Sequence, residues 1–333
     1  MNTPEELLAR AGKSFHLAGK FLPPDRRRAA TQLYAFCRGL DDLADETGDA
    51  AQIEAVATAL EDSDRSHPLA AFYLTLDDPD PSPAIALARA LRDDTGDAAQ
   101  IEAVATALES NNRSHPLAAL YLTLDDPDPA PAIALARALR DDTGPTQIAD
   151  ERALLRYCHG VAGTVGLMMA RVLGATEPAA AWHAIDLGIA LQLTNIARDT
   201  REDADHGRRY IPATWLPVPT PSIRGAQEVV HQAALRCLAL AEPYYASGIA
   251  GLVYLPPESR RGILVAARVY REIGEELRRR GPHRTEDRVI VPAWRKATLV
   301  AGALLGRTPW SDEKPMHDIS LHRELDGLVG ARR

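Results

Sequence analysis

The sequence predicts an all-α protein. Alanine, leucine and arginine, which favour helices, are abundant, whereas aromatic residues, which favour sheets, make up only 5% of the chain. Hydrophobic residues make up 46% of the 333 residues, which is enough for a sizeable core. Prolines open and glycines close successive apolar segments, as they do in helices. We therefore expect a bundle of helices.

Six helices are predicted outside a repeated region in the first half of the chain. Gly174 and Gly281 follow two of them, at the usual place for a glycine. The remaining residues, 308–333, are expected to form a polar C-terminal tail that is mobile in part. The predicted helices cover residues 24–46, 151–173, 178 to the end of an acidic motif at 203, 222–245, 257–280 and 292–305.

The repeated region is a direct duplication. Residues 47–94 and 95–142 are identical except at positions 62, 63, 64, 72 and 82 and their counterparts 48 residues later. Such near-identity is unlike a solenoid, whose repeats share only a few packing positions. We interpret it as a duplication inside one domain, which we expect to span residues 1–307. In the first copy, three short helices are predicted at 51–61, 67–76 and 83–94.

Because both copies offer the same apolar faces, we expect one to pack in the bundle and the other to form an accessory layer. An acidic loop in each copy has two interpretations, a metal loop or a solvated turn. The turn is favoured, because prolines interrupt the loop and neither the glycine nor the distal glutamate of a calcium loop is present. The loop aspartates are Asp77, Asp78 and Asp80, and Asp125, Asp126 and Asp128.

Charge and cysteine usage restrict the partners and the compartment. A net charge of -8 and a pI near 5.7 argue against a nucleic-acid partner. Cys37, Cys158 and Cys237 are few, odd in number and far apart, which suits a reducing compartment. The chain begins without the pattern of a signal peptide and has no run of about 20 apolar residues. We therefore expect a cytoplasmic location.

A peripheral contact with the inner face of the membrane stays open as an alternative. The apolar run at residues 263–267 either borders an entry for an apolar substrate or belongs to a core helix. The core interpretation is favoured, because such stripes are usually buried.

Two acidic stretches indicate the chemistry. Asp41 and Asp45 are four residues apart, as are Asn195, Asp199 and Asp203. In a helix this spacing stacks side chains on one face. Stacked carboxylates repel unless a cation lies between them, and Mg²⁺ is usually held by one or two carboxylates plus substrate phosphates. Two such faces opposite each other would hold a diphosphate in a magnesium cage.

The sequence resembles the phytoene and squalene synthase family in four ordered motifs. They are GKSF at 12–15, LYAFCR at 33–38 leading into the acidic residues 41–45, YCHGVAGTVG at 157–166, and QLTNIARD at 192–199, continuing to Tyr210. The resemblance covers about residues 8–46 and 150–300, and it is nearest to the bacterial phytoene synthases. It implies an all-α isoprenoid synthase fold that joins two allylic diphosphates head to head.

The resemblance implies a prenyltransferase of carotenoid biosynthesis that condenses two geranylgeranyl diphosphates to phytoene through prephytoene diphosphate. The cofactor is expected to be Mg²⁺ or Mn²⁺, which neutralises the diphosphate as it leaves. The implied metal ligands are Asp41, Asp45, Asn195, Asp199 and Asp203, and the four aspartates count as catalytic. The implied substrate contacts are Lys13, Ser14, Arg38, Gln192, Asn195, Arg198 and Arg288.

Tyr157, Tyr210 and Tyr270 stand at positions where the family has site tyrosines, and their rings would face the carbocation. On residue type alone, an aromatic residue on a helix is by default a core residue, and the family position makes the two interpretations about equal. No nicotinamide cofactor is expected, because Gly160, Gly163 and Gly166 do not match the fingerprint that lies between a strand and a helix. Their spacing on a helix instead allows a close approach of a second helix or leaves room for a prenyl chain.

Two alternatives stay open. The first is a squalene, dehydrosqualene or hydroxysqualene synthase acting on farnesyl diphosphate, because chain length depends on pocket depth. The second is a catalytically impaired homologue that only binds prenyl diphosphates or partner enzymes. It is motivated by the duplication and by residues 138–142, which stand where relatives often carry an Asp-Gly-Met stretch.

Overall fold

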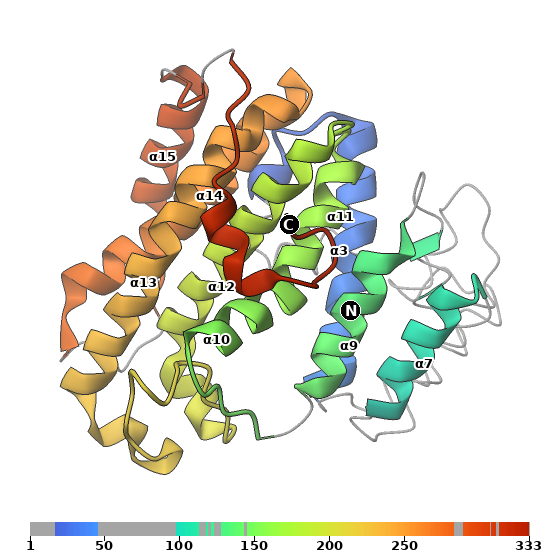
Figure 1. Cartoon of the computed structure of the whole chain (residues 1–333). Coiled ribbons are helices and arrows are strands. Elements are labelled where there is room, and N and C mark those ends of the chain that lie inside the picture. The colour runs from blue at the N-terminus through green and yellow to red at the C-terminus, as the bar shows by residue number, and fades with distance from the viewer. Residues whose placement is uncertain are drawn as a thin grey trace, which may run out of the picture. The chain divides into compact units, whose positions relative to one another are not determined.

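The computed structural model describes residues 17–45, 98–112, 118, 121–122, 128–142, 145–282, 289–306, 308–310 and 313–332. The regular elements in these ranges are helices (Figure 1). In addition, one isolated β-bridge pairs Gln147 with Arg209. The all-α prediction is therefore confirmed. The chain divides into two compact units, one formed by residues 1–19 and 24–143 and the other by residues 20–23 and 144–333. Each unit is described by itself, and the prediction of a single domain over residues 1–307 stays a prediction.

The first unit contains α3 (Pro24–Asp45), α7 (Ala98–Glu109) and α9 (Pro129–Asp141). α7 and α9 pack against each other, and both contact α3. Leu33 of α3, Ile101 of α7 and Leu135 of α9 are fully buried. Both α7 and α9 come from the second copy of the duplication, where they match two predicted helices to within two residues. The first copy lies outside the described residues.

Polar contacts fix the ends and the pairing of α7 and α9. Arg137 Nη2 lies 2.5 Å from Glu109 Oε1, and Arg140 donates to Glu102 across the same pair. Asp128 accepts a 3.0 Å hydrogen bond from the Ala130 N–H and so caps α9. This residue of the acidic loop thus serves as a helix cap, in keeping with the turn interpretation. The other five loop aspartates lie outside the described residues.

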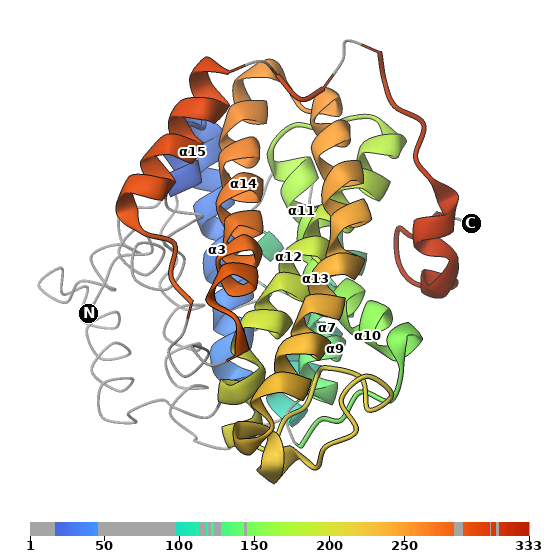
Figure 2. The same cartoon turned by 90° about the vertical axis from the view of Figure 1, so that its left-hand side faces the viewer.

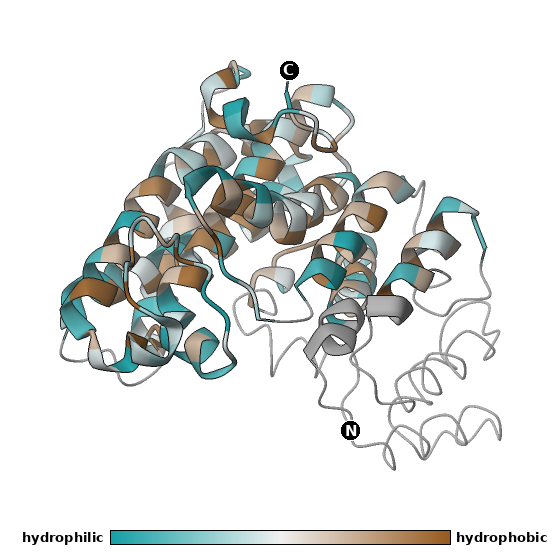
Figure 3. Cartoon of the chain, turned by 60° about the horizontal axis from the view of Figure 1, so that its bottom comes forward, coloured by the Kyte–Doolittle hydropathy of each residue, from teal (hydrophilic) through white to brown (hydrophobic). Residues whose placement is uncertain are grey.

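The second unit is built around α12 (Pro178–Asp205). α12 contacts α11, α13 and α14, and Figure 2 shows α15 beside α14. Hydrophilic and hydrophobic residues alternate around these helices (Figure 3), as expected when one face is buried. The other elements are α10 (Glu151–Cys158), the π-helical turn η1 (His159–Gly163), α11 (Thr164–Val172), the 3-10 helix η2 (Thr220–Gly225), α13 (Gln227–Ala250), the 3-10 helix η3 (Gly251–Tyr254), α14 (Pro257–Arg280), α15 (Ala293–Leu305) and the 3-10 helix η5 (Ile319–Leu325).

The predicted helices are confirmed in number and order within this unit, with two differences. The helix predicted at 151–173 is continuous but contains the π-helical turn η1. The helix predicted at 222–245 begins and ends five residues later, and Pro243 lies inside it. Tyr245 and Gly248, beyond this proline, are buried, so packing carries the helix past the residue expected to end it.

Two glycines let α12 approach the preceding helix closely. A Cβ atom on Gly166 would lie 2.2 Å from the Ala184 carbonyl oxygen, and one on Gly188 would lie 2.2 Å from the Ala162 carbonyl oxygen. Neither position tolerates a side chain without a backbone shift. The predicted close approach is therefore confirmed at Gly166.

The C-terminal segment folds back onto the second unit. Leu325 is fully buried, and the Tyr244 hydroxyl donates a 2.9 Å hydrogen bond to the Leu321 carbonyl. Arg156 donates to the Asp326 carbonyl at 3.1 Å. Residues 313–332 of the predicted polar tail thus belong to the packed unit.

Candidate active site

The second acidic motif lies on the last third of α12. The helix is unbroken through residues 195–203, so Asn195, Asp199 and Asp203 follow one another at intervals of one turn, about 6 Å along the axis. The opposite side of this stretch, with Leu193 and Ala197, is buried in the core. The three oxygen-bearing side chains therefore share one face of a helix whose other face is anchored.

Asn195 carries an unusual polar atom. Its Oδ1 is buried and has no hydrogen-bond partner, while its Nδ2 donates a long 3.4 Å bond to Gln192 Oε1. A buried carbonyl without a partner is unfavourable by roughly 1–3 kcal/mol. A buried oxygen without a partner suits a hard divalent cation, because the carboxylates of Asp199 and Asp203 follow one and two turns further along the same face. The residues present therefore fit the expected metal.

Arg198 and Asp199 form a bidentate ion pair at the same face. Arg198 Nε donates to Asp199 Oδ1 at 2.7 Å, and Nη2 donates to Oδ2. Both side chains are less than one-fifth exposed. Burial by itself lowers the pKa of the Arg198 guanidinium, but the hydrogen bonds and charge of Asp199 outweigh it and raise that pKa. Arg198 thus stays a cation beside the metal face.

The three candidate tyrosines pack on the core. Tyr157 of α10 and Tyr210 stack, with ring centroids 4.7 Å apart and planes 20° apart. Their contact is supported by the bridge that joins Arg209 to Gln147, just before α10. Tyr270 of α14 is partly buried and packs against the core.

The first acidic motif belongs to the other unit. Asp41 and Asp45 lie one turn apart at the end of α3, with Arg38 in the turn before them. The described part of the structure includes the helix there but not the two aspartate side chains. Lys13, Ser14 and Arg288 lie outside the described residues. A metal cage formed between α3 and α12 thus stays a prediction.

One supporting residue escaped the sequence analysis. Tyr245 of α13 is buried, and its hydroxyl lies 2.9 Å from Thr194 Oγ1, next to Asn195. Burial raises the pKa of Tyr245, so its hydroxyl stays protonated. This bond holds α12 to α13 at the start of the acidic face. Nothing in the sequence links positions 194 and 245, because the contact depends on tertiary packing.

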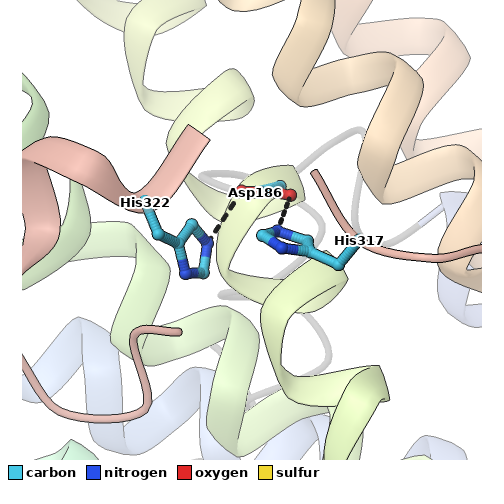
Figure 4. A group of neighbouring side chains, drawn as sticks. All are labelled: Asp186, His317 and His322. Atoms are coloured by element: carbon cyan, nitrogen blue, oxygen red, sulfur yellow. Dashed lines mark hydrogen bonds and ion pairs between the residues drawn. The ribbon is translucent and has the colours of Figure 1, made fainter. Parts of the chain in front are cut away.

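A second polar cluster lies about two and a half turns before Asn195 on α12 (Figure 4). Asp186 is fully buried, and its carboxylate contacts His317 Nε2 at 2.9 Å and His322 Nε2 at 3.1 Å. Ser247 of α13 donates a third hydrogen bond to it. Burial raises the pKa of Asp186, but these three hydrogen bonds outweigh it and lower that pKa. The cluster joins α12, α13 and the C-terminal segment.

Among the described residues, Asp186, His317 and His322 have the spacing of a metal site. The hydrogen bonds argue for a purely protein network instead. The Arg332 backbone N–H donates to His322 Nδ1 at 2.8 Å, so the ring proton lies on Nε2 and faces Asp186. A nitrogen that carries a proton cannot bind a metal.

A helical bundle with an Asn/Asp/Asp face beside a buried arginine defines a class, the helical enzymes that handle diphosphates through divalent metals. The family pattern described as Squalene/phytoene synthase matches residues 8–295. The chain belongs to this family. The family is of the divalent-metal-dependent prenyltransferase kind and acts on prenyl diphosphates, so the chain is a transferase.

Individual relatives support this family assignment. A 15-cis-phytoene synthase of a Paracoccus species is 36% identical over 301 residues, which cover 86% of this chain and 85% of the relative. A phytoene synthase of Pseudescherichia vulneris is 33% identical over 285 residues, covering 83% of this chain and 82% of the relative.

Solved structures support the fold. The structure of a dehydrosqualene synthase in complex with a ligand matches this chain with a TM-score of 0.63 and 25% sequence identity, and the match covers 91% of this chain and 94% of that enzyme's chain. The structure of a squalene synthase of Alicyclobacillus acidocaldarius matches with a TM-score of 0.51 and 23% sequence identity, and the match covers 84% of this chain and 94% of that enzyme's chain.

Among the described residues, no helix is long and apolar enough to span a membrane.

Proposed function

We propose that this chain condenses two geranylgeranyl diphosphates head to head to phytoene, through prephytoene diphosphate. The observation that carries the proposal is the face of α12, where the buried, unpartnered oxygen of Asn195 stands in line with Asp199 and Asp203. The phytoene synthases among the relatives favour this product over squalene or dehydrosqualene.

The roles of the residues follow from their chemistry. Asn195, Asp199 and Asp203 on α12, with Asp41 and Asp45 on α3, would hold Mg²⁺. When bound, Mg²⁺ supplies Lewis-acid neutralisation of the departing diphosphate. Arg198 is already charged and partly desolvated, and its guanidinium suits phosphate oxygens. The stacked pair Tyr157 and Tyr210, together with Tyr270, would offer ring faces to the carbocation.

The test is a product assay with the purified full-length chain and Mg²⁺. Geranylgeranyl diphosphate and farnesyl diphosphate are supplied separately and then in competition, and the lipid products are separated by chromatography. Phytoene from the longer substrate supports the proposal. A thirty-carbon product formed in preference identifies a squalene-type synthase instead, and absence of diphosphate release identifies an impaired homologue.

A pair of variants on one helix tests the metal face. We expect Asp199→Ala to lower turnover at least about 100-fold, because a metal ligand is lost. Asp205→Ala is the matched control, since Asp205 is an exposed aspartate on the same helix, outside the four-residue series and paired with Arg224. Equal activity of the two variants would contradict the assignment.

The proposed setting is the cytoplasm, with a peripheral contact at the inner face of the membrane. The reason is that the proposed product, phytoene, would be a hydrocarbon with no polar group. The apolar run at residues 263–267 does not supply this contact, because Leu264, Val265, Ala266 and Ala267 are buried in the core.

A further inference from the structure

The hydroxyl of Thr194, the residue before Asn195, makes two buried hydrogen bonds. Its Oγ1 donates to the Ala190 carbonyl, one turn earlier on α12, at 2.9 Å. The same Oγ1 lies 2.9 Å from the Tyr245 hydroxyl of α13. Because the one proton of the Thr194 hydroxyl is used within α12, Tyr245 is the donor of the second bond. Tyr245 is thereby tied through Thr194 to the backbone of α12.

This hydrogen bond fixes how α12 lies along α13 at the start of the acidic face. Apolar burial between the two helices is non-directional, and small alanine side chains interlock little. A buried hydrogen bond, in contrast, allows only a narrow range of distance and angle. A second polar connection, from Ser247 to Asp186, lies eight residues before Thr194, about 12 Å along the axis, and fixes an earlier part of the helix. The apolar residues of this interface are Leu193, Ala197, Ala234, Leu238 and Ala241.

The side chain of Asn195 has little of its own to fix it. Its Oδ1 has no partner, and its Nδ2 makes only the long 3.4 Å bond to Gln192. Asp199, in contrast, receives two hydrogen bonds from Arg198. The place of the Asn195 oxygen therefore depends on the backbone of α12 at residues 194 and 195. A metal ligand has to be placed to within about 0.5 Å, so a contact that holds this backbone matters for metal binding.

We propose that Tyr245 is a positioning residue for the metal face, which holds the Asn195 oxygen in place through Thr194. The proposal rests on the proposed function in one respect, that this face of α12 binds a divalent metal. Tyr245 acts through Thr194 and has no contact with metal or substrate in this role. Loss of its hydroxyl should therefore weaken metal binding while every ligand is still present.

The neighbouring Tyr244 supplies a matched control. Both tyrosine rings are buried on α13, and each hydroxyl makes a 2.9 Å hydrogen bond. Burial raises the pKa of both hydroxyls, so both keep their protons. Their partners differ, because Tyr244 donates to the Leu321 carbonyl in the C-terminal segment, whereas Tyr245 donates to Thr194. Replacing either tyrosine by phenylalanine removes the same group, but only Tyr245→Phe releases α12.

The test measures Mn²⁺ binding to the full-length chain in the presence of inorganic diphosphate, by electron paramagnetic resonance. The Mg²⁺ concentration that gives half-maximal diphosphate release is the second readout. We expect Tyr245→Phe to raise both half-saturation concentrations about fivefold. This is less than the roughly 10–100-fold effect of groups that contact a metal ligand directly, because Tyr245 acts through one more residue.

The control variants should keep the ordinary metal requirement. Tyr244→Phe should lower the melting temperature about as much as Tyr245→Phe, since each loses one buried hydrogen bond, but leave both half-saturation concentrations unchanged. Thr194→Ser retains the hydroxyl that accepts from Tyr245 and should also bind metal normally. Thr194→Val removes this acceptor and should reproduce the weaker metal binding of Tyr245→Phe.

Two results would overturn the proposal. They are normal metal binding in Tyr245→Phe, which would make the bond purely structural, and an equal weakening in Tyr244→Phe. The proposed function is judged separately, because a thirty-carbon product would reject phytoene synthesis and leave the comparison of metal binding intact. Absence of Mn²⁺ binding in the unaltered chain would reject the metal face, and the positioning role with it.

Discussion

At the scale of single residues, Asn195 shows how a site is held ready at the expense of stability. Its Oδ1 is buried without a partner, although Gln192 lies next to its amide. Native proteins keep few such atoms, and each calls for an explanation. A metal ligand is the explanation that also accounts for Asp199 and Asp203 on the same face.

This explanation predicts a loss of activity without a matching loss of stability. We expect Asn195→Ala to change the free energy of unfolding by less than about 1 kcal/mol in metal-free buffer, because it removes an unsatisfied carbonyl. Turnover should fall at least tenfold. Urea denaturation and the product assay measure the two. A destabilisation above about 2 kcal/mol would indicate that Asn195 is a structural residue.

His159 predicts a pH dependence of stability. It is buried, and its Nε2 lies 3.0 Å from the Val329 carbonyl, to which it donates. Burial lowers the pKa of His159 from 6.5 to about 4, and burial also lowers that of His183. The unfolded chain therefore binds these protons more readily than the folded chain.

Stability should be full above about pH 6.5 and fall as the pH drops towards 4. His159 alone accounts for roughly 3 kcal/mol over this window. The Asp186 carboxylate acts in a separate window, because its lowered pKa removes stability only below 3.8. Denaturation midpoints at pH 7.5, 6, 5 and 4 measure the slope. Stability that is constant or rises on acidification would contradict this account.

At the scale of helices, the contact between α11 and α12 depends on missing side chains. We expect Gly166→Ala to destabilise the chain by about 2–3 kcal/mol, because its Cβ atom would lie 2.2 Å from the Ala184 carbonyl oxygen. Gly225→Ala is the control, since nothing lies within 4 Å of its added Cβ. Thermal unfolding of the two variants makes the comparison. Equal melting temperatures would show that the helices separate without strain.

Helix positions were predictable wherever local chemistry decides them. α14 has the predicted bounds, because Pro257 suits a first turn and Gly281 adopts a φ of 68° at the end. The face formed by Asn195 and Asp199 was predictable for the same reason, since it needs only a continuous helix. The turn η1 was not, because its apolar pattern matches an ordinary α-helix.

At the scale of the whole molecule, the duplication predicts interchangeable deletions. Deleting residues 47–94 joins Glu46 to Thr95, which reproduces the Glu46–Thr47 junction, and leaves the α7–α9 pair intact. Deleting 95–142 instead gives a chain that differs at only five positions. We expect both chains to fold with similar melting temperatures and similar turnover.

Calorimetry and the product assay compare these two deletions with the full chain. A deletion that unfolds would show that the two copies have different roles. A large gain in turnover in both deletions would show that the extra copy impairs catalysis.

Contacts between distant segments could not be predicted. Asp186 meets His317 and His322 across more than a hundred residues, and no local pattern marks these positions as partners. The same holds for Thr194 and Tyr245. Such pairs are set by how helices pack, which the spacing of residues along one helix does not reveal.

The folding back of the C-terminal segment has a consequence for synthesis. His322 and Leu325 fill buried positions beside α10 and α12, and His322 completes the hydrogen bonds of Asp186. While the ribosome is still making these residues, α12 keeps a buried carboxylate without its full set of donors. The second unit therefore completes its core only after residue 325 has emerged, and a nascent chain halted earlier should remain a substrate for chaperones and proteases.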